Sequence, residues 1–282
     1  MILNNAGQGT FTPAARISVG VNATGFVSAD FNNDGNLDLV VRGEPSGLAL
    51  YLGAGGLGFT QSATGIGGDI TNVFFTSGDF NGDGKRDLAI FDDLQSQTGD
   101  GLNIVILLGD GQGGFGQPSN VRIQERLSFL KAEDLNLDGR DDLIYGRQLA
   151  GNAVFVVLSN PEGGFGAPVS YQVGGGTQSV VSTDINGDGK LDLISSSFDT
   201  GTISLLLGDG DGGFNQQMSL PVFDSPSLIV TGDFDQDGRI DLAIPRTGAS
   251  LIAIINNNSI CVPQSSVAPA TEANKFQYRA RP

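Results

Sequence analysis

Five short segments of the chain carry acidic and amide side chains at one common spacing. Asp or Asn stands at positions 1, 3, 5 and 9 of each segment, and Gly stands at position 6. Alternate side chains of a curled loop converge on one point, and Gly permits the sharp turn that such a loop needs. The pattern predicts one cation site per segment. We call these segments Asp loops 1 to 5: DFNNDGNLD (30–38), DFNGDGKRD (79–87), DLNLDGRDD (134–142), DINGDGKLD (184–192) and DFDQDGRID (233–241).

Hard carboxylate and amide oxygens, with no His or Cys among them, favour Ca²⁺ over zinc, and Mg²⁺ would keep more of its waters. The predicted side-chain ligands are Asp30, Asn32, Asp34 and Asp38; Asp79, Asn81, Asp83 and Asp87; Asp134, Asn136, Asp138 and Asp142; Asp184, Asn186, Asp188 and Asp192; and Asp233, Asp235, Asp237 and Asp241. The main-chain carbonyl of position 7 is expected to complete each site, together with water, from Asn36, Lys85, Arg140, Lys190 and Arg239. We expect about five structural Ca²⁺ per chain, which would change the formal charge from −16 to −6.

The Asp loops could also be plain turns or EF-hands. The pattern Asp-x-Asn-x-Asp-Gly is ordinary turn chemistry, but turn chemistry has no use for a further Asp at position 9 in every copy. An EF-hand loop begins in the same way but needs Glu at position 12. That position is occupied by Val41, Ile90, Tyr145, Ser195 and Ile244.

The composition excludes several classes of function. The chain of 282 residues has no His, so it lacks imidazole for acid–base work, for His-assisted nucleophiles and for zinc ligation. Cys261 has no internal disulfide partner. More than half of the 31 acidic residues lie in the Asp loops, and the net charge of −16 argues against nucleic acid and anionic membranes as partners, because both require basic patches.

The elements around the loops are expected to be β-strands. Apolar runs that enter a Gly-rich turn and end in Phe recur between the loops, as in IVILLGDGQGGF (104–115) and ISLLLGDGDGGF (203–214). Such runs indicate β-hairpins, and short apolar strands flank each Asp loop. Each repeat of about 50 residues is therefore predicted to be a four-stranded meander. Units of this length match the blades of an all-β propeller.

The phase of the repeat predicts how the propeller closes. The first Phe, Phe11, precedes any complete unit, and the last unit stops after LIAII (251–255) without its own Phe strand. We therefore expect the strand near 10–19 to pair with the strand at 250–255 and to close five blades over residues 1–258. The alternative is a piece of a larger propeller, because MILNN (1–5) resembles a third strand. Residues 259–282 are expected to form a linker or disordered tail.

The loops with the form D-x-[DN]-x-D-G-x-x-D, together with FGQP (115–118) and FGAP (165–168), resemble the FG-GAP/VCBS repeats of the integrin α-subunit propeller and of bacterial surface proteins. The resemblance covers residues 1–258. It departs from the integrin pattern in blade number, since that propeller has seven blades. It implies a calcium-binding propeller in a secreted or cell-surface protein. The first residues show no signal-peptide pattern, so we expect a mature form or a part of a longer polypeptide.

In the resembled family the Asp loops lie on one face and the opposite face binds ligands. We therefore expect an adhesion or binding module for a protein or glycan partner, without enzymatic activity, nucleic-acid binding or membrane insertion. A lectin and a glycan-cleaving enzyme are the alternatives, although Trp is absent and acids outside the loops, namely Asp69, Asp92, Asp93, Asp100, Asp199 and Asp224, show no evident pairing. The opposite face would be built by residues 42–47, 91–101, 146–152, 196–201 and 245–249, of which the second is the longest loop.

Overall fold

A computed structural model describes residues 2–7, 10–15, 17–19, 21–44, 47–56, 58–67, 73–92, 102–124, 126–147, 152–162, 164–222, 225–246, 251–258 and 277–280. Every regular element in these ranges is a β-strand, as the apolar runs and Gly-rich turns of the sequence predict. None of the described residues belongs to a helix that could cross a membrane.

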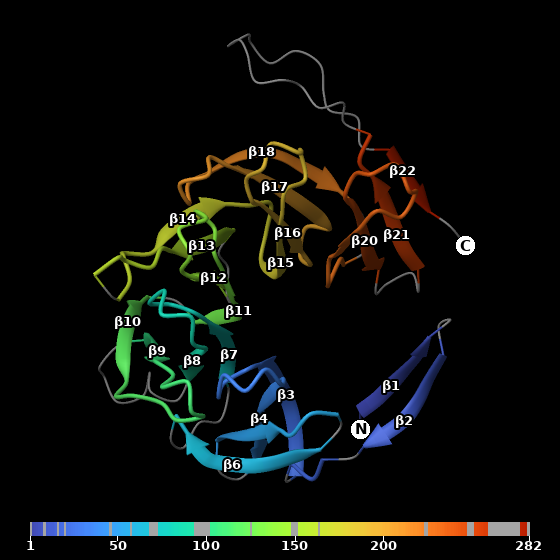
Figure 1. Cartoon of the computed structure of the whole chain (residues 1–282). Coiled ribbons are helices and arrows are strands. Elements are labelled where there is room, and N and C mark those ends of the chain that lie inside the picture. Colours follow the sequence, from blue (N-terminus) through green and yellow to red (C-terminus); the bar gives the residue numbers. More distant parts are fainter. Residues whose placement is uncertain are drawn as a thin grey trace. The chain divides into compact units, whose positions relative to one another are not determined.

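The described strands form one hairpin and five four-stranded antiparallel sheets (Figure 1). In each sheet the strands are neighbours in chain order, which is the predicted meander. The hairpin is β1 (Ile2–Gly7) with β2 (Thr10–Ala15); sheet 1 is β3 (Val21–Ala29), β4 (Asp38–Glu44), β5 (Leu48–Gly53) and β6 (Phe59–Ile66); sheet 2 is β7 (Val73–Gly78), β8 (Asp87–Asp92), β9 (Leu102–Leu107) and β10 (Ser119–Ile123); sheet 3 is β11 (Leu127–Glu133), β12 (Asp142–Arg147), β13 (Ala153–Val157) and β14 (Val169–Gln172); sheet 4 is β15 (Thr177–Thr183), β16 (Asp192–Ser197), β17 (Thr202–Gly208) and β18 (Phe214–Pro221); and sheet 5 is β19 (Val230–Gly232), β20 (Asp241–Arg246), β21 (Leu251–Asn256) and β22 (Gln277–Ala280).

The chain divides into two compact units. Unit 1 comprises Met1–Glu125, Leu130–Ala132 and Ser159–Gly166, and unit 2 comprises Arg126–Phe129, Glu133–Leu158 and Ala167–Pro282. Sheets 1 and 2 lie in unit 1, and sheets 4 and 5 with most of sheet 3 lie in unit 2. Within each unit the first strands of consecutive sheets are neighbours: β3 contacts β7, and β15 contacts β19.

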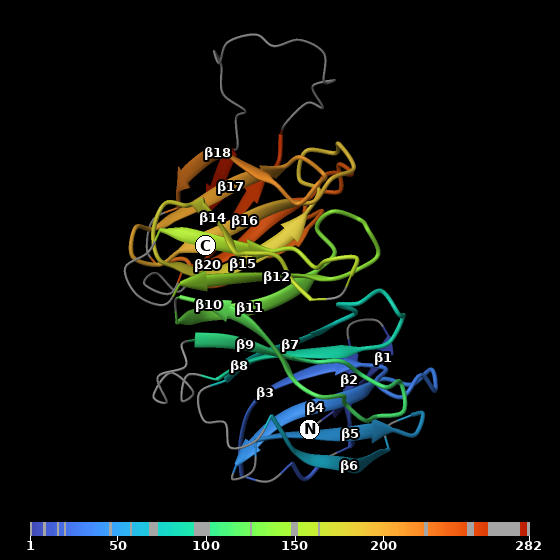
Figure 2. The ribbon, with the colours of Figure 1, turned by 90° about the vertical axis from the view of Figure 1, so that its left-hand side faces the viewer.

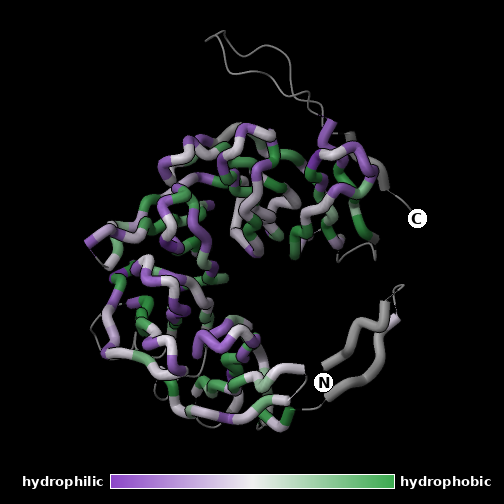
Figure 3. Tube along the Cα trace, viewed as in Figure 1, coloured by the Kyte–Doolittle hydropathy of each residue, from purple (hydrophilic) through white to green (hydrophobic). Residues whose placement is uncertain are grey.

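Consecutive sheets bury their apolar faces against each other within a unit. In unit 1, Val40 and Leu50 of sheet 1 share one core with Leu88 and Ile90 of sheet 2, and all four are fully buried. Figure 2 shows sheet 2 lying directly next to sheet 1. Figure 3 shows hydrophobic segments within the sheets, which alternate along the chain with hydrophilic ones.

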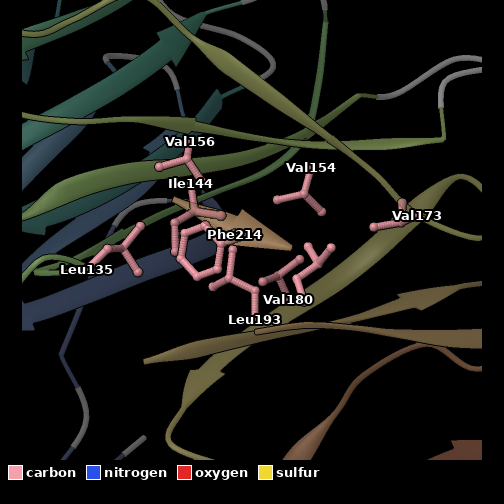
Figure 4. Packing of buried hydrophobic residues seen from close by; sticks show 9 residues of the cluster. Leu135, Ile144, Val154, Val156, Val173, Val180, Leu193 and Phe214 are labelled. Atoms are coloured by element: carbon pink, nitrogen blue, oxygen red, sulfur yellow. The ribbon is translucent and has the colours of Figure 1, made fainter. Parts of the chain in front are cut away.

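Unit 2 repeats this packing. Ile144 of β12 and Leu193 of β16 pack with Phe214, the first residue of β18, in one cluster (Figure 4). All six residues of β16 are buried, as are the first five of β12. A strand that is buried at every position is covered on both faces, whereas a strand with one solvated face would alternate. The five sheets are therefore consistent with propeller blades.

The strand expected to close the propeller is paired differently. We expected residues 10–19 to pair with 250–255, but β2 pairs with β1, and β21 pairs with β22. Without a neighbour, one edge of β21 would leave backbone N–H and C=O groups unpaired. The later strand β22, and not the N-terminal strand, supplies their partners. The β1–β2 hairpin forms across a two-residue connection, which has a small loop-closure cost. Within the segment expected to be a tail, the structure describes only the strand at 277–280.

Candidate metal centres

Each Asp loop joins the first and second strands of its sheet. Position 9 is the first residue of β4, β8, β12, β16 and β20 in turn. The five loops therefore occupy the same place in five equivalent sheets, as the sequence predicted.

The acidic side chain at position 1 shapes each loop from inside. In loop 1, Asp30 Oδ2 accepts the N–H of Gly35 at 2.8 Å, and its Oδ1 accepts the N–H of Asp34 at 3.2 Å. The four other loops contain the same two bonds at 2.8–3.1 Å. Oδ1 of the position-5 Asp also accepts the position-7 N–H in all five loops, at 2.8–3.0 Å. The oxygens at positions 1 and 5 therefore turn toward the interior of the loop.

Gly at position 6 is required by the backbone conformation. Gly35 has φ of +85°, and the four equivalent glycines have φ between +78° and +86°. No atom lies within 4 Å of a Cβ added to any of the five, so space does not explain the choice. The left-handed conformation does, because L side chains rarely adopt it.

Position 4 also lies in the left-handed region in every loop. Gly occupies it in loops 2 and 4, whereas Asn33, Leu137 and Gln236 adopt φ of 57–63° there. Among residues other than Gly, Asn is enriched in this conformation, whereas Leu rarely adopts it. The side chain of Leu137 is also 63% exposed. Position 4 is thus an outward-facing tip that tolerates different residue types.

Asp at position 9 has a role that the sequence reasoning missed. All five of these residues are fully buried. In sheet 2, Asp87 Oδ2 accepts the N–H of Phe80 at 2.9 Å, and its Oδ1 accepts the N–H of Gly109, beyond the third strand, at 2.8 Å. Asp38, Asp192 and Asp241 make the same pair of bonds in their own sheets. This carboxylate therefore ties the loop to the end of the third strand.

The glycine at the end of the third strand could have indicated this contact between the strand end and the Asp loop from the sequence alone. A Cβ on Gly109 would lie 2.2 Å from the carbonyl oxygen of Arg86, at loop position 8. Gly53 and Gly208 are in the same situation with the carbonyl oxygens of Leu37 and Leu191, at 2.3 and 2.2 Å. In sheets 1, 2 and 4, the Gly that begins the Gly-rich turn therefore permits the third strand to approach the Asp loop.

The acidic groups converge most closely in loop 5. Asp233, Asp235 and Asp237 each offer a carboxylate oxygen within 4.8 Å of the other two, and among the described residues this is the group of three acids that could hold a metal ion. Asp241 lies outside that group. In the other loops Asn replaces Asp at position 3, as in Asn81, whose Oδ1 accepts the N–H of Asp83 at 3.0 Å.

The donor set fits Ca²⁺. The converging groups are all oxygens, and the backbone is already curled around them. The buried position-9 carboxylate uses one lone pair of each oxygen for its backbone bonds, so each oxygen retains one. Direct ligation by position 9 and by the position-7 carbonyl remains a prediction.

Burial dominates the electrostatics of position 9 in loops 2 and 4. The pKa of Asp87 is raised to about 6, mainly by burial and to a smaller extent by the neighbouring charges of Asp83 and Asp79, while the backbone hydrogen bonds from Gly109 and Phe80 act in the opposite direction. The pKa of Asp192 is likewise raised to about 6, mainly by burial. In loop 1, the hydrogen bond from Asn32 is the main cause of the lowered pKa of Asp34. The buried acids Asp87 and Asp192 therefore hold a proton more tightly than the exposed Asp34 does.

The predicted ligand-binding face is only partly described. Residues 196–201 form the end of β16 and the turn before β17, at the opposite end of these strands from loop 4, and Phe198 there is 43% exposed. Residues 93–101, which contain the longest insertion, lie outside the described residues, as do 148–151 and 247–250.

Comparisons with known proteins give a family match and a fold match. A family model described as FG-GAP-like repeat matches residues 1–41, 30–90, 134–195 and 184–244, which together contain all five Asp loops. No curated protein matches the chain.

Several solved structures are similar to the chain, among them the following two. The crystal structure of BBS1N in complex with ARL6DN, soaked with lead, has a TM-score of 0.54 and 12% identity over 82% of this chain and 63% of that chain. The biofilm matrix protein Bap1 of V. cholerae has a TM-score of 0.41 and 19% identity over 82% of this chain and 36% of that one. The chain thus spans less than two thirds of either protein chain, and the first likeness concerns the fold alone.

The two roles of Asp within one loop lead to a prediction for the calcium-free protein. Asp87→Ala leaves the buried N–H groups of Phe80 and Gly109 without acceptors, so the free energy of unfolding should fall by about 2–4 kcal/mol, although removal of a buried charge offsets part of the loss. The matched variant Asp83→Ala, at an exposed loop acid, should change it by less than about 1 kcal/mol. Urea unfolding in excess chelator measures both. Equal effects of the two variants would contradict the structural role of position 9.

The raised pKa values of Asp87 and Asp192 predict a pH dependence for the calcium-free protein. A folded-state pKa of about 6 against an ordinary 3.8 means that the folded chain binds these protons more tightly. Their stabilisation is complete below pH 3.8 and is lost as pH rises through 6, so acidification from pH 7 to 5 should raise the free energy of unfolding by roughly 1–1.5 kcal/mol per group. Acids with lowered pKa, such as Asp34, titrate below this window. Urea unfolding in chelator at pH 7, 6 and 5 measures the effect, and a flat or falling stability would refute it.

Proposed function

Because the chain belongs to the FG-GAP-like repeat family, we propose that it is a calcium-stabilised propeller module that binds a protein or glycan partner outside the cell. The observation that supports the calcium sites most directly is the identical inward geometry of the acids at positions 1 and 5 in five Asp loops. In this proposal sheets 1 to 5 are the blades. In the alternative, a larger propeller, the β1–β2 hairpin supplies the third and fourth strands of a further blade.

In each loop the ion would be held by the side chains at positions 1, 3, 5 and 9 and by the position-7 carbonyl. When bound, Ca²⁺ supplies positive charge that offsets the repulsion among three or four acids. The loop residues keep their oxygens turned inward through hydrogen bonds to their own backbone, so little reorganisation accompanies binding. At 10- to 100-fold saturation each site contributes about 1.4–2.7 kcal/mol to stability.

The partner would bind at the turns between second and third strands, on the face opposite the Asp loops. These turns lie at the ends of well-packed strands, a common location for binding residues. In the described part, the 196–201 turn offers the exposed ring of Phe198 beside Asp199 and Thr200. An exposed aromatic next to polar groups suits a protein or a glycan surface.

A lectin and a glycan-cleaving enzyme remain the alternatives. A lectin would need aromatic platforms, but Tyr51 and Tyr145 are buried, and Tyr145 stacks on Phe155. An enzyme would need two carboxyl groups about 5–10 Å apart in a cleft. A small cavity within the described part of unit 2 is lined by apolar residues, including Ile194, Met218 and Leu242, and no acid lines it.

Calcium removal tests the first part of the proposal. The chelated chain should take up about five Ca²⁺, and exhaustive chelation should lower the melting temperature by about 10 °C or more, because several ion-linked contributions disappear together. Asp237→Ala should lose one ion. The control Asp211→Ala removes an exposed acid from a Gly-rich turn and should keep all five. Uptake of no more than one ion, or unchanged melting in chelator, would refute the calcium sites.

A partner screen tests the second part. Protein and glycan arrays probed with the full chain should give binding in Ca²⁺ that is lost in chelator. Phe198→Ala should weaken binding about tenfold or more, whereas Leu137→Ala, on an Asp-loop tip, should leave it unchanged. The opposite result for the two variants would place the partner on the Asp-loop face. Binding that is independent of both variants would overturn the proposed surface.

A further inference from the structure

In loops 2, 3 and 5 the cationic side chain at position 7 contacts the acid at position 5. In loop 3, Arg140 Nη2 lies 2.5 Å from Asp138 Oδ2. In loop 2, Lys85 Nζ lies 3.2 Å from Asp83 Oδ2, and in loop 5 Arg239 pairs with Asp237. A cation of the chain thus contacts an acid that is proposed to bind the metal.

Loop 1 differs from the others at this position. Its position-7 residue is Asn36, whose amide Nδ2 donates to Asp34 Oδ1 at 2.9 Å. Loop 4 carries a cation, Lys190, but in the described part of the chain this Lys forms no ion pair with Asp188, and its aliphatic carbons lie against Gly210. The five loops therefore offer the metal different electrostatic surroundings, although their proposed ligands are nearly the same.

The pair in loop 3 is the least exposed of the three. The side chain of Arg140 is 17% exposed and that of Asp138 is 26% exposed, against 37% and 33% for Lys85 and Asp83. Arg140 Nε is buried and has no hydrogen-bond partner. The guanidinium is therefore held in place through Nη2 and the carboxylate. Water screens such a pair less than an exposed one.

We propose that the position-7 cation is a built-in competitor for the metal, which rests on the calcium sites proposed above. Arg140 neutralises Asp138 when the loop is empty and repels a divalent ion at the same oxygen. Calcium binding must displace this contact or tolerate the repulsion, so loop 3 binds Ca²⁺ more weakly than loop 1, where a neutral amide stands instead. The chain consequently fills its loops in order as calcium rises, with loop 1 before loop 3.

The loop glycines provide one reporter for each site. The N–H of Gly35 and that of Gly139 each donate to the position-1 carboxylate of their own loop, so both amide resonances should respond to metal at that carboxylate. Titration of Ca²⁺ into the chelated, ¹⁵N-labelled full chain follows all loops in one sample. In the native chain Gly35 should reach half-change at a lower free calcium concentration than Gly139.

Replacement of the cation tests the competition directly. Arg140→Asn introduces the residue that loop 1 already accepts, and it should lower the half-filling concentration of loop 3 about 2- to 10-fold, the range expected for a partly screened ion pair. The matched control Lys190→Asn removes the same charge at the same position where no pair exists, and it should shift loop 4 less than 2-fold. The reciprocal variant Asn36→Arg should weaken loop 1, and it keeps the test valid if Arg140→Asn does not fold.

The outcomes separate this inference from the calcium proposal. If the glycines respond to Ca²⁺ but Arg140→Asn leaves Gly139 unchanged, or if Lys190→Asn shifts loop 4 as strongly, the competitor is refuted and the calcium sites stand. If no loop glycine responds to Ca²⁺ at all, both proposals are overturned.

Discussion

The buried carboxylate at loop position 9 is the interaction on which the rest of each repeat depends. Asp87 opens the second strand of its sheet, and its two oxygens accept one N–H from the Asp loop and one from the end of the third strand. A single side chain thereby fixes three segments of backbone. Burial makes this costly for a charged group, and the two backbone donors offset that cost. The oxygens at positions 1 and 5, which turn toward the interior of the loop, therefore belong to a loop whose last residue is already fixed.

The residue at loop position 2 extends this connection to the next sheet. In unit 1 the N–H of Phe31 donates to Asp38, its carbonyl accepts the N–H of Gly113, and its ring meets Phe115 edge to face. In unit 2 the carbonyl of Ile185 accepts from the side-chain amide of Asn257. The Asp loop is thus a connector between consecutive sheets, which explains physically why such repeats need neighbours. An ion that stiffens the loop acts on two sheets together.

The features that depend on residues close together in the chain could be predicted from the sequence. Strands, the Gly at position 6 and the place of each loop between two strands followed from short-range pattern, because period and turn chemistry determine them. Long-range pairings did not follow. Phe115 stands 19 residues before loop 3, yet its ring packs on Phe31 in loop 1. The pairing of β21 with β22 and the contact between Arg140 and Asp138 also depend on three-dimensional placement that spacing along the chain does not encode.

The left-handed tip at loop position 4 has a consequence for how duplicated repeats diverge. The backbone fixes φ there, at a cost of about 1–2 kcal/mol for a residue such as Leu137, and Leu137 itself is 63% exposed. Substitution at this point therefore alters the surface without altering the ligand geometry. Gly, Asn, Leu and Gln already occupy it in different copies. After a repeat is copied, the five tips are free to acquire separate surface chemistries by single mutations, while selection on the loop beneath them stays the same.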